Sequence, residues 1–144
     1  MAEPLPDGRP PYREPPAFNV PGPVLALLLL VVGIHLVMSA LDWAMREQVI
    51  LWFALFPIRY TEGASAIADA LPGGLAADIW TPVTYTFLHG GWEHLIVNSV
   101  WLLAFGSPIA QRFGATRFFL FYFLCGAAGA FLLYTSVPCH VISP

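Results

Sequence analysis

Three long stretches of this chain contain no charged side chain, and this feature constrains the fold more than any other. Residues 15–41 and 94–111 hold no Asp, Glu, Lys or Arg, and none follows Arg117. A helix needs about 20 predominantly apolar residues to cross the hydrocarbon core of a bilayer. The pattern therefore predicts an all-α, polytopic membrane protein.

The apolar runs predict three transmembrane helices, at about 24–41, 94–111 and 117–135. The middle one is shorter and contains Asn98 and Ser99, so a buried helix of a soluble core is the alternative. The short segment 111–117 favours an antiparallel pair of membrane helices instead, because short connections join antiparallel neighbours. Gly114 in that segment suits a helix C-terminus, where a positive φ is needed.

Composition supports a membrane protein and excludes other classes. Hydrophobic residues make up 58% of the chain and charged residues 10%, against roughly 45–50% and 25% in ordinary soluble domains. The net charge of -3 has the wrong sign for nucleic acid, so no nucleic-acid partner is expected.

The two cysteines are too few for a disulfide scaffold. Cys125 is expected to be an inert buried thiol, and a catalytic pair of Cys139 with His140 is disfavoured.

The ends of the chain and its arginines predict an orientation. The proline-rich residues 1–23 are expected to form a flexible cytoplasmic tail, and the first helix is expected to be a retained anchor rather than a cleaved signal. Arg9 and Arg13 precede that helix, and Arg112 and Arg117 lie in the short turn, which puts both on the cytoplasmic side. Arginine without lysine, with abundant Ala, Gly and Pro, suggests a bacterial inner membrane.

The long connection over residues 42–93 does not resemble a plain linker. It contains an apolar, aromatic stretch at 49–56, which is too short to span a bilayer and fits an interfacial or re-entrant segment. A turn is expected at 72–74 and a second interfacial anchor at 80–82. The sequence thus predicts a structured loop, partly embedded in the membrane.

Four polar residues gather where the second membrane helix begins: His89, Glu93, His94 and Asn98. His94 and Asn98 are four apart and share one helical face. Two neutral donors facing a cavity could stabilise an oxyanion. The alternatives are an interhelical hydrogen bond from Asn98, an interfacial His94, and a metal site that lacks a clear third ligand. From the residues alone, the structural role for Asn98 is favoured.

The phrase Phe-Leu-His-Gly-Gly-Trp-Glu-His-Leu-Ile-Val-Asn at 87–98 resembles the second-helix signature of rhomboid intramembrane serine proteases. The likeness extends over about 24–130. It implies cleavage of transmembrane protein substrates near the outer face, without metal or cofactor. His94 and Asn98 would help form the oxyanion hole, and His89 would support them. The usual Trp-Arg pair of the long loop is here Trp80-Thr81, and Gln111 replaces an acid.

The resemblance also implies a serine nucleophile in Gly-x-Ser-Gly and a histidine base on later helices, and these 144 residues contain neither. The chain is therefore expected to be the N-terminal part of such a protease, with residues 138–144 as a truncated end, and to be inactive and prone to associate when isolated. The alternative is a non-catalytic rhomboid-like protein that binds client transmembrane helices. A chance match in an unrelated three-helix protein is disfavoured.

Overall fold

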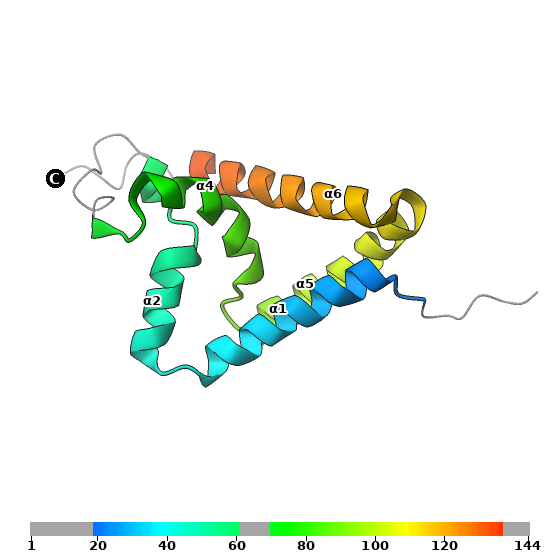
Figure 1. The fold of residues 1–144 in the computed structure, drawn as a ribbon, viewed down its shortest axis with the longest axis horizontal. Helices are drawn as coiled ribbons and strands as arrows, with labels where there is room; N and C mark the ends of the chain where they lie inside the picture. Colours follow the sequence, from blue (N-terminus) through cyan, green and yellow to red (C-terminus); the bar gives the residue numbers. More distant parts are fainter. Residues whose placement is uncertain (1–18, 61–69, 137–144) are drawn as a thin grey trace, which may run out of the picture.

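The computed structural model describes residues 19–60 and 70–136, with side chains up to residue 132. All regular structure in these residues is helical, which confirms the predicted all-α class (Figure 1). The proline-rich tail up to residue 18, together with Cys139 and His140, lies outside the described residues. The elements are α1 (Gly22–Ala40), α2 (Trp43–Phe53), η1 (Pro57–Tyr60), α4 (Gly74–Thr84), η2 (Tyr85–Phe87), α5 (Trp92–Trp101), the π-helical turn η3 (Leu102–Gly106) and α6 (Ser107–Ser136).

The connection between α1 and α2 is closed by two side chains. Arg46 of α2 donates from Nε to the carbonyl of Met38 at 2.9 Å and from Nη2 to that of Ser39 at 3.2 Å. These carbonyls end α1 and have no partner within the helix. Asp42 caps α2, because its Oδ1 accepts from the backbone N–H of Met45 at 2.9 Å. The chain therefore makes a fixed corner where it leaves α1.

The helices α5 and α6 run in opposite directions and join at one end of the molecule (Figure 1). The helix continues from α5 through η3 into α6, and Gly114 interrupts it with φ 79° and ψ 174°. The expected positive φ at Gly114 is thus confirmed, although one residue, rather than a seven-residue turn, leaves the helical conformation. The Gln111 side chain donates to the carbonyl of Asn19 at 3.0 Å, so this end lies beside the start of α1.

A small core lies where α1, α5 and α6 meet. The buried hydrophobic cluster consists of Val24, Leu27, Val31, Leu95, Ala110 and Phe118. Gly106 lets the Phe118 ring approach closely, since a Cβ at Gly106 would lie 3.0 Å from Phe118 Cε2. Lipid tails are as apolar as these side chains, so close packing rather than removal from water would stabilise this contact in a bilayer.

Two segments of the described chain are long and apolar enough to cross a membrane: Gly22–Ala40, with mean hydropathy 2.4, and Trp92–Leu132, with mean hydropathy 1.5. Few residues of either segment are buried within the protein, and large apolar side chains such as Leu29 and Phe131 are exposed. A core helix of a soluble protein would be mostly buried. Exposed apolar helices of this length are typical of an integral membrane protein.

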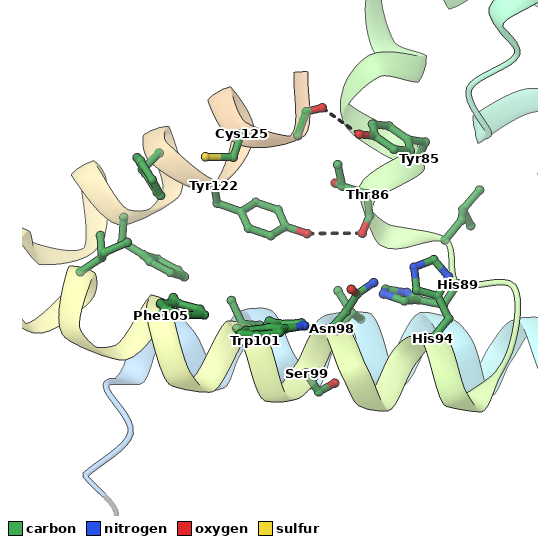
Figure 2. Close-up of a pocket in the computed structure, with 18 residues that line it drawn as sticks. Tyr85, Thr86, His89, His94, Asn98, Ser99, Trp101, Phe105, Tyr122 and Cys125 are labelled. Carbon is green, nitrogen blue, oxygen red and sulfur yellow. Dashed lines mark hydrogen bonds between the residues drawn. The ribbon is translucent and has the colours of Figure 1, made fainter. Parts of the chain in front are cut away.

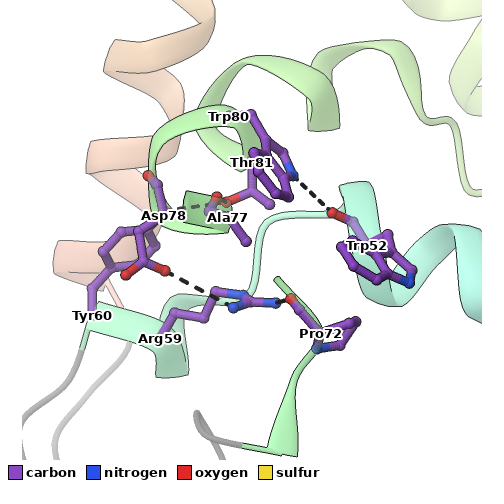
Figure 3. Close-up of polar contacts among 8 residues, drawn as sticks. All are labelled: Trp52, Arg59, Tyr60, Pro72, Ala77, Asp78, Trp80 and Thr81. Carbon is purple, nitrogen blue, oxygen red and sulfur yellow. Dashed lines mark hydrogen bonds and ion pairs between the residues drawn. The ribbon is translucent and has the colours of Figure 1, made fainter. Parts of the chain in front are cut away.

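In the described parts of the connection between α1 and α5, the helices α2 and α4 are joined through a polar cluster (Figure 3). Arg59 donates to the carbonyl of Pro72 at 2.7 Å and lies 3.9 Å from the Asp78 carboxylate. The indole of Trp80 donates to the carbonyl of Trp52 at 3.0 Å, and their rings stack. The described parts of the connection are therefore folded against each other. Its insertion into the membrane stays a prediction.

Candidate functional site

A cavity of about 460 Å³ opens between α5 and α6, with the η2 turn at one end (Figure 2). Its walls are mainly apolar and aromatic, and a few polar side chains face it. The polar and sulfur-containing residues that line it are Tyr85, Thr86, His89, His94, Asn98, Ser99, Tyr122 and Cys125. An apolar cavity with few polar groups is the usual form of a ligand site in a protein.

His94 and Asn98 both line this cavity. Helix α5 begins at Trp92, directly after Gly90 and Gly91. His94 therefore lies in the first turn of this helix, and Asn98 lies one turn further along. Figure 2 shows their side chains beside each other at the cavity floor. Neither side chain forms a hydrogen bond to another residue in the described part of the chain. Their donors are therefore available to a group that enters the cavity.

His89 lies on the short segment between η2 and α5, directly beside His94. The two imidazole centroids are 5.2 Å apart, in an edge-to-face arrangement. Nδ1 of His89 lies 3.3 Å from the carbonyl oxygen of Phe87. Partial burial lowers the pKa of His89 below its ordinary value; the contact with the Phe87 carbonyl opposes this shift, and the imidazoles of His94 and His35 add to it. The fold thus favours a neutral His89 ring.

A third histidine, His35 of α1, lies at the same end of the molecule, and the sequence reasoning did not single it out. Its ring contacts Trp92, the first residue of α5, with centroids 4.6 Å apart, and it is 6% exposed. Its Nδ1 has no hydrogen-bond partner. The sequence did contain a signal for His35, which is a lone imidazole within an apolar run. Polar residues in a membrane helix are costly, so such a residue commonly has a specific contact or role.

The structure corrects one prediction about a reactive group. The prediction that Cys125 is buried is wrong: its thiol is exposed, because this residue lines the cavity rather than the helix core. Ser99 also lines the cavity, but its hydroxyl donates to the carbonyl of Leu95 in its own helix at 2.7 Å. No group of three or more His, Cys, Asp or Glu residues in 19–60 and 70–136 could hold a metal ion.

The arrangement can bind an oxygen atom that carries partial or full negative charge. Two side chains, His94 and Asn98, offer N–H donors to one cavity, whose apolar walls limit competition from water. Helix α5 begins nearby, and its unpaired N–H groups carry partial positive charge. None of the described side chains in the cavity forms a pair of nucleophile and base, so the site can stabilise charge but offers no attacking group.

This region of the chain is similar to known proteins. Residues 76–140 match the sequence profile of the Rhomboid domain. RHOMBOID-like protein 9, chloroplastic, from Arabidopsis thaliana is 39% identical over 66 residues, which is 44% of this chain and 15% of that protein. Rhomboid-related protein 3 from Homo sapiens is 43% identical over 56 residues, which is 39% of this chain and 14% of that protein. The chain thus covers about one seventh of these relatives. No solved structure matches significantly.

Proposed function

We propose that this chain, whose residues 76–140 match the Rhomboid domain, is part of a rhomboid-type intramembrane serine endopeptidase in which His94 and Asn98 stabilise the oxyanion. The substrates would be transmembrane proteins, cut near the outer face of the membrane. The single observation that carries the proposal is that both side chains line one cavity with their donors unused.

The chemistry follows from the charge that develops during peptide-bond cleavage. When a serine oxygen attacks the carbonyl carbon, the carbonyl oxygen becomes negative. Donors that already point at this position stabilise the transition state without reorganisation. A neutral imidazole and a carboxamide suit this task inside a membrane, because burying a charged group there is costly.

The proposal requires partners for these donors. The serine of a Gly-x-Ser-Gly phrase and its histidine base are absent from the 144 residues, so they would have to be supplied from outside this sequence. In the proposed arrangement three segments each cross the bilayer: α1, the helix from the start of α5 to residue 113, and the part of α6 that follows Gly114. The Gly114 break divides the longer apolar segment into two antiparallel crossings. The cavity between those crossings would receive the catalytic groups.

The test is a chimera in which residues 1–144 are joined to the later helices of a rhomboid protease that carries the serine and the base. It is purified in detergent and given a fluorogenic transmembrane substrate. We expect His94→Ala and Asn98→Ala each to lower kcat by about 10²–10³-fold, the usual cost of losing one oxyanion donor. KM should change little, because these donors act mainly in the transition state.

The matched control is Asn19→Ala, at the opposite end of α1 from the contact between His35 and Trp92. It should leave kcat unchanged, and the 144-residue chain alone should show no turnover. Full activity of the Asn98→Ala chimera would refute the oxyanion role.

The alternative is a helix-binding protein without catalysis, which the wide apolar cavity also suits. It would be supported if the chimera crosslinked to the substrate helix but neither cut it nor reacted with a fluorophosphonate probe.

A further inference from the structure

The short turn η2 connects α4 to the segment that carries His89, and it is fastened to α6. Two tyrosine hydroxyls make this connection (Figure 2). Tyr85 donates to the carbonyl of Gly126 at 2.8 Å, and Tyr122 donates to the carbonyl of Thr86 at 3.3 Å. The hydrogen bonds run in opposite directions between the turn and the helix, so each element supplies one donor and one acceptor.

The backbone of α6 comes unusually close to the turn at this point. A Cβ at Gly126 would lie 2.6 Å from Cγ2 of Thr86, a distance that real Cβ contacts essentially never show. One turn further along α6, a Cβ at Gly129 would lie 3.0 Å from the Tyr85 hydroxyl. Small residues in membrane helices commonly permit the close approach of a neighbouring helix. Here the close neighbour is the η2 turn.

The fastened turn leads directly to His89. The Phe87 ring, at the end of η2, packs against Tyr122 and Phe123 of α6, with centroids 6.4 Å and 6.2 Å away. The Phe87 carbonyl oxygen is the atom that lies 3.3 Å from Nδ1 of His89. A continuous series of contacts thus runs from Gly126 through Thr86 and Phe87 to the His89 imidazole, which faces His94 across 5.2 Å.

We propose that Tyr85, Thr86 and Gly126 act as positioning residues, which hold the His89 imidazole against His94 at the η2 end of the cavity through the contact between η2 and α6. The meaning of this contact for catalysis rests on the proposed function, but the contact itself can be tested without any activity. We call this contact the η2–α6 clasp.

The clasp offers a test with a built-in rescue. Gly126→Ala adds the Cβ that collides with Thr86 Cγ2, so the turn must move away from α6. Thr86→Ser removes Cγ2 but keeps the hydroxyl, which donates to the carbonyl of Val83 at 2.7 Å. After Cγ2 is removed, the nearest atom named at Gly126 is Thr86 Cβ at 3.9 Å, an ordinary contact. The double variant should therefore regain the native arrangement.

The measurement is an NMR titration of the full chain in detergent with isotope-labelled histidine. In Gly126→Ala we expect the His89 resonance to shift and its pKa to rise toward the ordinary value of about 6.5, because burial is the largest cause of the lowered pKa and the displaced ring is less buried, while the local contact with Phe87 moves with the turn. Both should return in Gly126→Ala with Thr86→Ser. Gly33→Ala is the matched control, since a Cβ there meets nothing within 4 Å, and it should leave His89 unchanged.

Tyr85→Phe gives a second route that adds no bulk, in case Gly126→Ala does not fold. It removes only the hydrogen bond to the Gly126 carbonyl, and we expect a smaller shift of the same sign. The proposal fails if a folded Gly126→Ala protein keeps the native His89 resonance and pKa, if Thr86→Ser does not restore them, or if Tyr85→Phe leaves His89 unchanged. An inactive chimera would refute the proposed function and leave these results standing.

Discussion

The polar side chains of the cavity differ in how their hydrogen-bonding groups are occupied. His89 lies beside a backbone carbonyl, and Ser99 donates to its own helix. The Tyr122 hydroxyl donates to the carbonyl of Thr86 in the η2 turn. His94 and Asn98 have no such partner among the described residues, so their donors are the ones left for a substrate. This difference, rather than mere presence in the cavity, separates the proposed oxyanion donors from their supporting residues.

The first prediction concerns pH and His89. Because its folded-state pKa is lowered, mainly by burial, the unfolded chain binds more protons than the folded chain just below pH 6.5, the approximate pKa of a free histidine. The neutral ring's contribution to stability is therefore present above that pH and decreases as pH falls. We expect His89→Gln to reduce the loss of unfolding free energy between about pH 7 and pH 5.

The measurement is the free energy of unfolding in mixed micelles at a series of pH values, for the native protein and for His89→Gln. The difference between the two curves isolates His89 from the other titrating groups. Parallel curves would mean that the ring is not held in a surrounding that disfavours its charge.

The sequence could supply some of these residues but not others. A spacing of four placed His94 and Asn98 on one face of a helix, and the structure has both lining one cavity. The partners that surround them come from distant parts of the chain, such as His35 against Trp92 and Tyr85 against Gly126. Such pairs follow from how helices pack, not from local spacing. Hydropathy likewise does not say whether an apolar helix position such as Cys125 faces a core, lipid or a cavity.

Among the elements, the reversal between α5 and α6 depends most on one residue. Gly114 has φ 79° and ψ 174°, a backbone region that is essentially restricted to glycine. The site of a Cβ at Gly114 is open, with nothing within 4 Å. Any penalty for a side chain there is therefore one of backbone conformation rather than collision.

The second prediction follows from this geometry. Gly114→Ala should lower the free energy of unfolding by about 1–3 kcal/mol, the usual cost of holding a residue in such a region. The control is Gly33→Ala, which also adds a methyl group in open space but within the regular helix α1. It should be neutral or stabilise by up to about 1 kcal/mol, because alanine favours helix more than glycine does. Equal effects of the two substitutions would contradict this account.

The elements themselves were predictable to different degrees. Charge-free windows were sufficient to predict long apolar helices, and the segments Gly22–Ala40 and Trp92–Leu132 have that character. Helices α2 and α4 could not be assigned in this way, because each is only 11 residues long, and α2 has almost no amphipathic pattern. Their ends depend on the Asp42 cap and on contacts such as Trp80 with Trp52, which connect residues far apart in the sequence.

At the scale of the whole molecule, the described residues have two distinct ends. The start of α1 and the turn between α5 and α6 lie together, joined by the hydrogen bond from Gln111 to Asn19. The helices α2 and α4 lie toward the opposite end (Figure 1). The site residues His89 and His94 lie at the α2 and α4 side of the arm formed by α5, where that arm begins. A bilayer crossed by α1, α5 and α6 would therefore separate the Gly114 turn from the site.

The third prediction tests this separation and the orientation given by the arginines. Single cysteines are introduced at Ala115, beside the Gly114 turn, and at Leu75, which is 86% exposed at the start of α4. The background carries Cys125→Ala and Cys139→Ser, so that each variant has one thiol. In right-side-out membrane vesicles of a bacterial host, a membrane-impermeant maleimide should label Leu75→Cys and not Ala115→Cys, if the turn lies on the cytoplasmic side as Arg112 and Arg117 predict. Detergent should expose Ala115→Cys to the reagent. Labelling of both cysteines in intact vesicles would mean that the segment between them, which contains α5 and η3, does not cross the bilayer. The same result would remove the lipid-facing surroundings on which the oxyanion proposal depends.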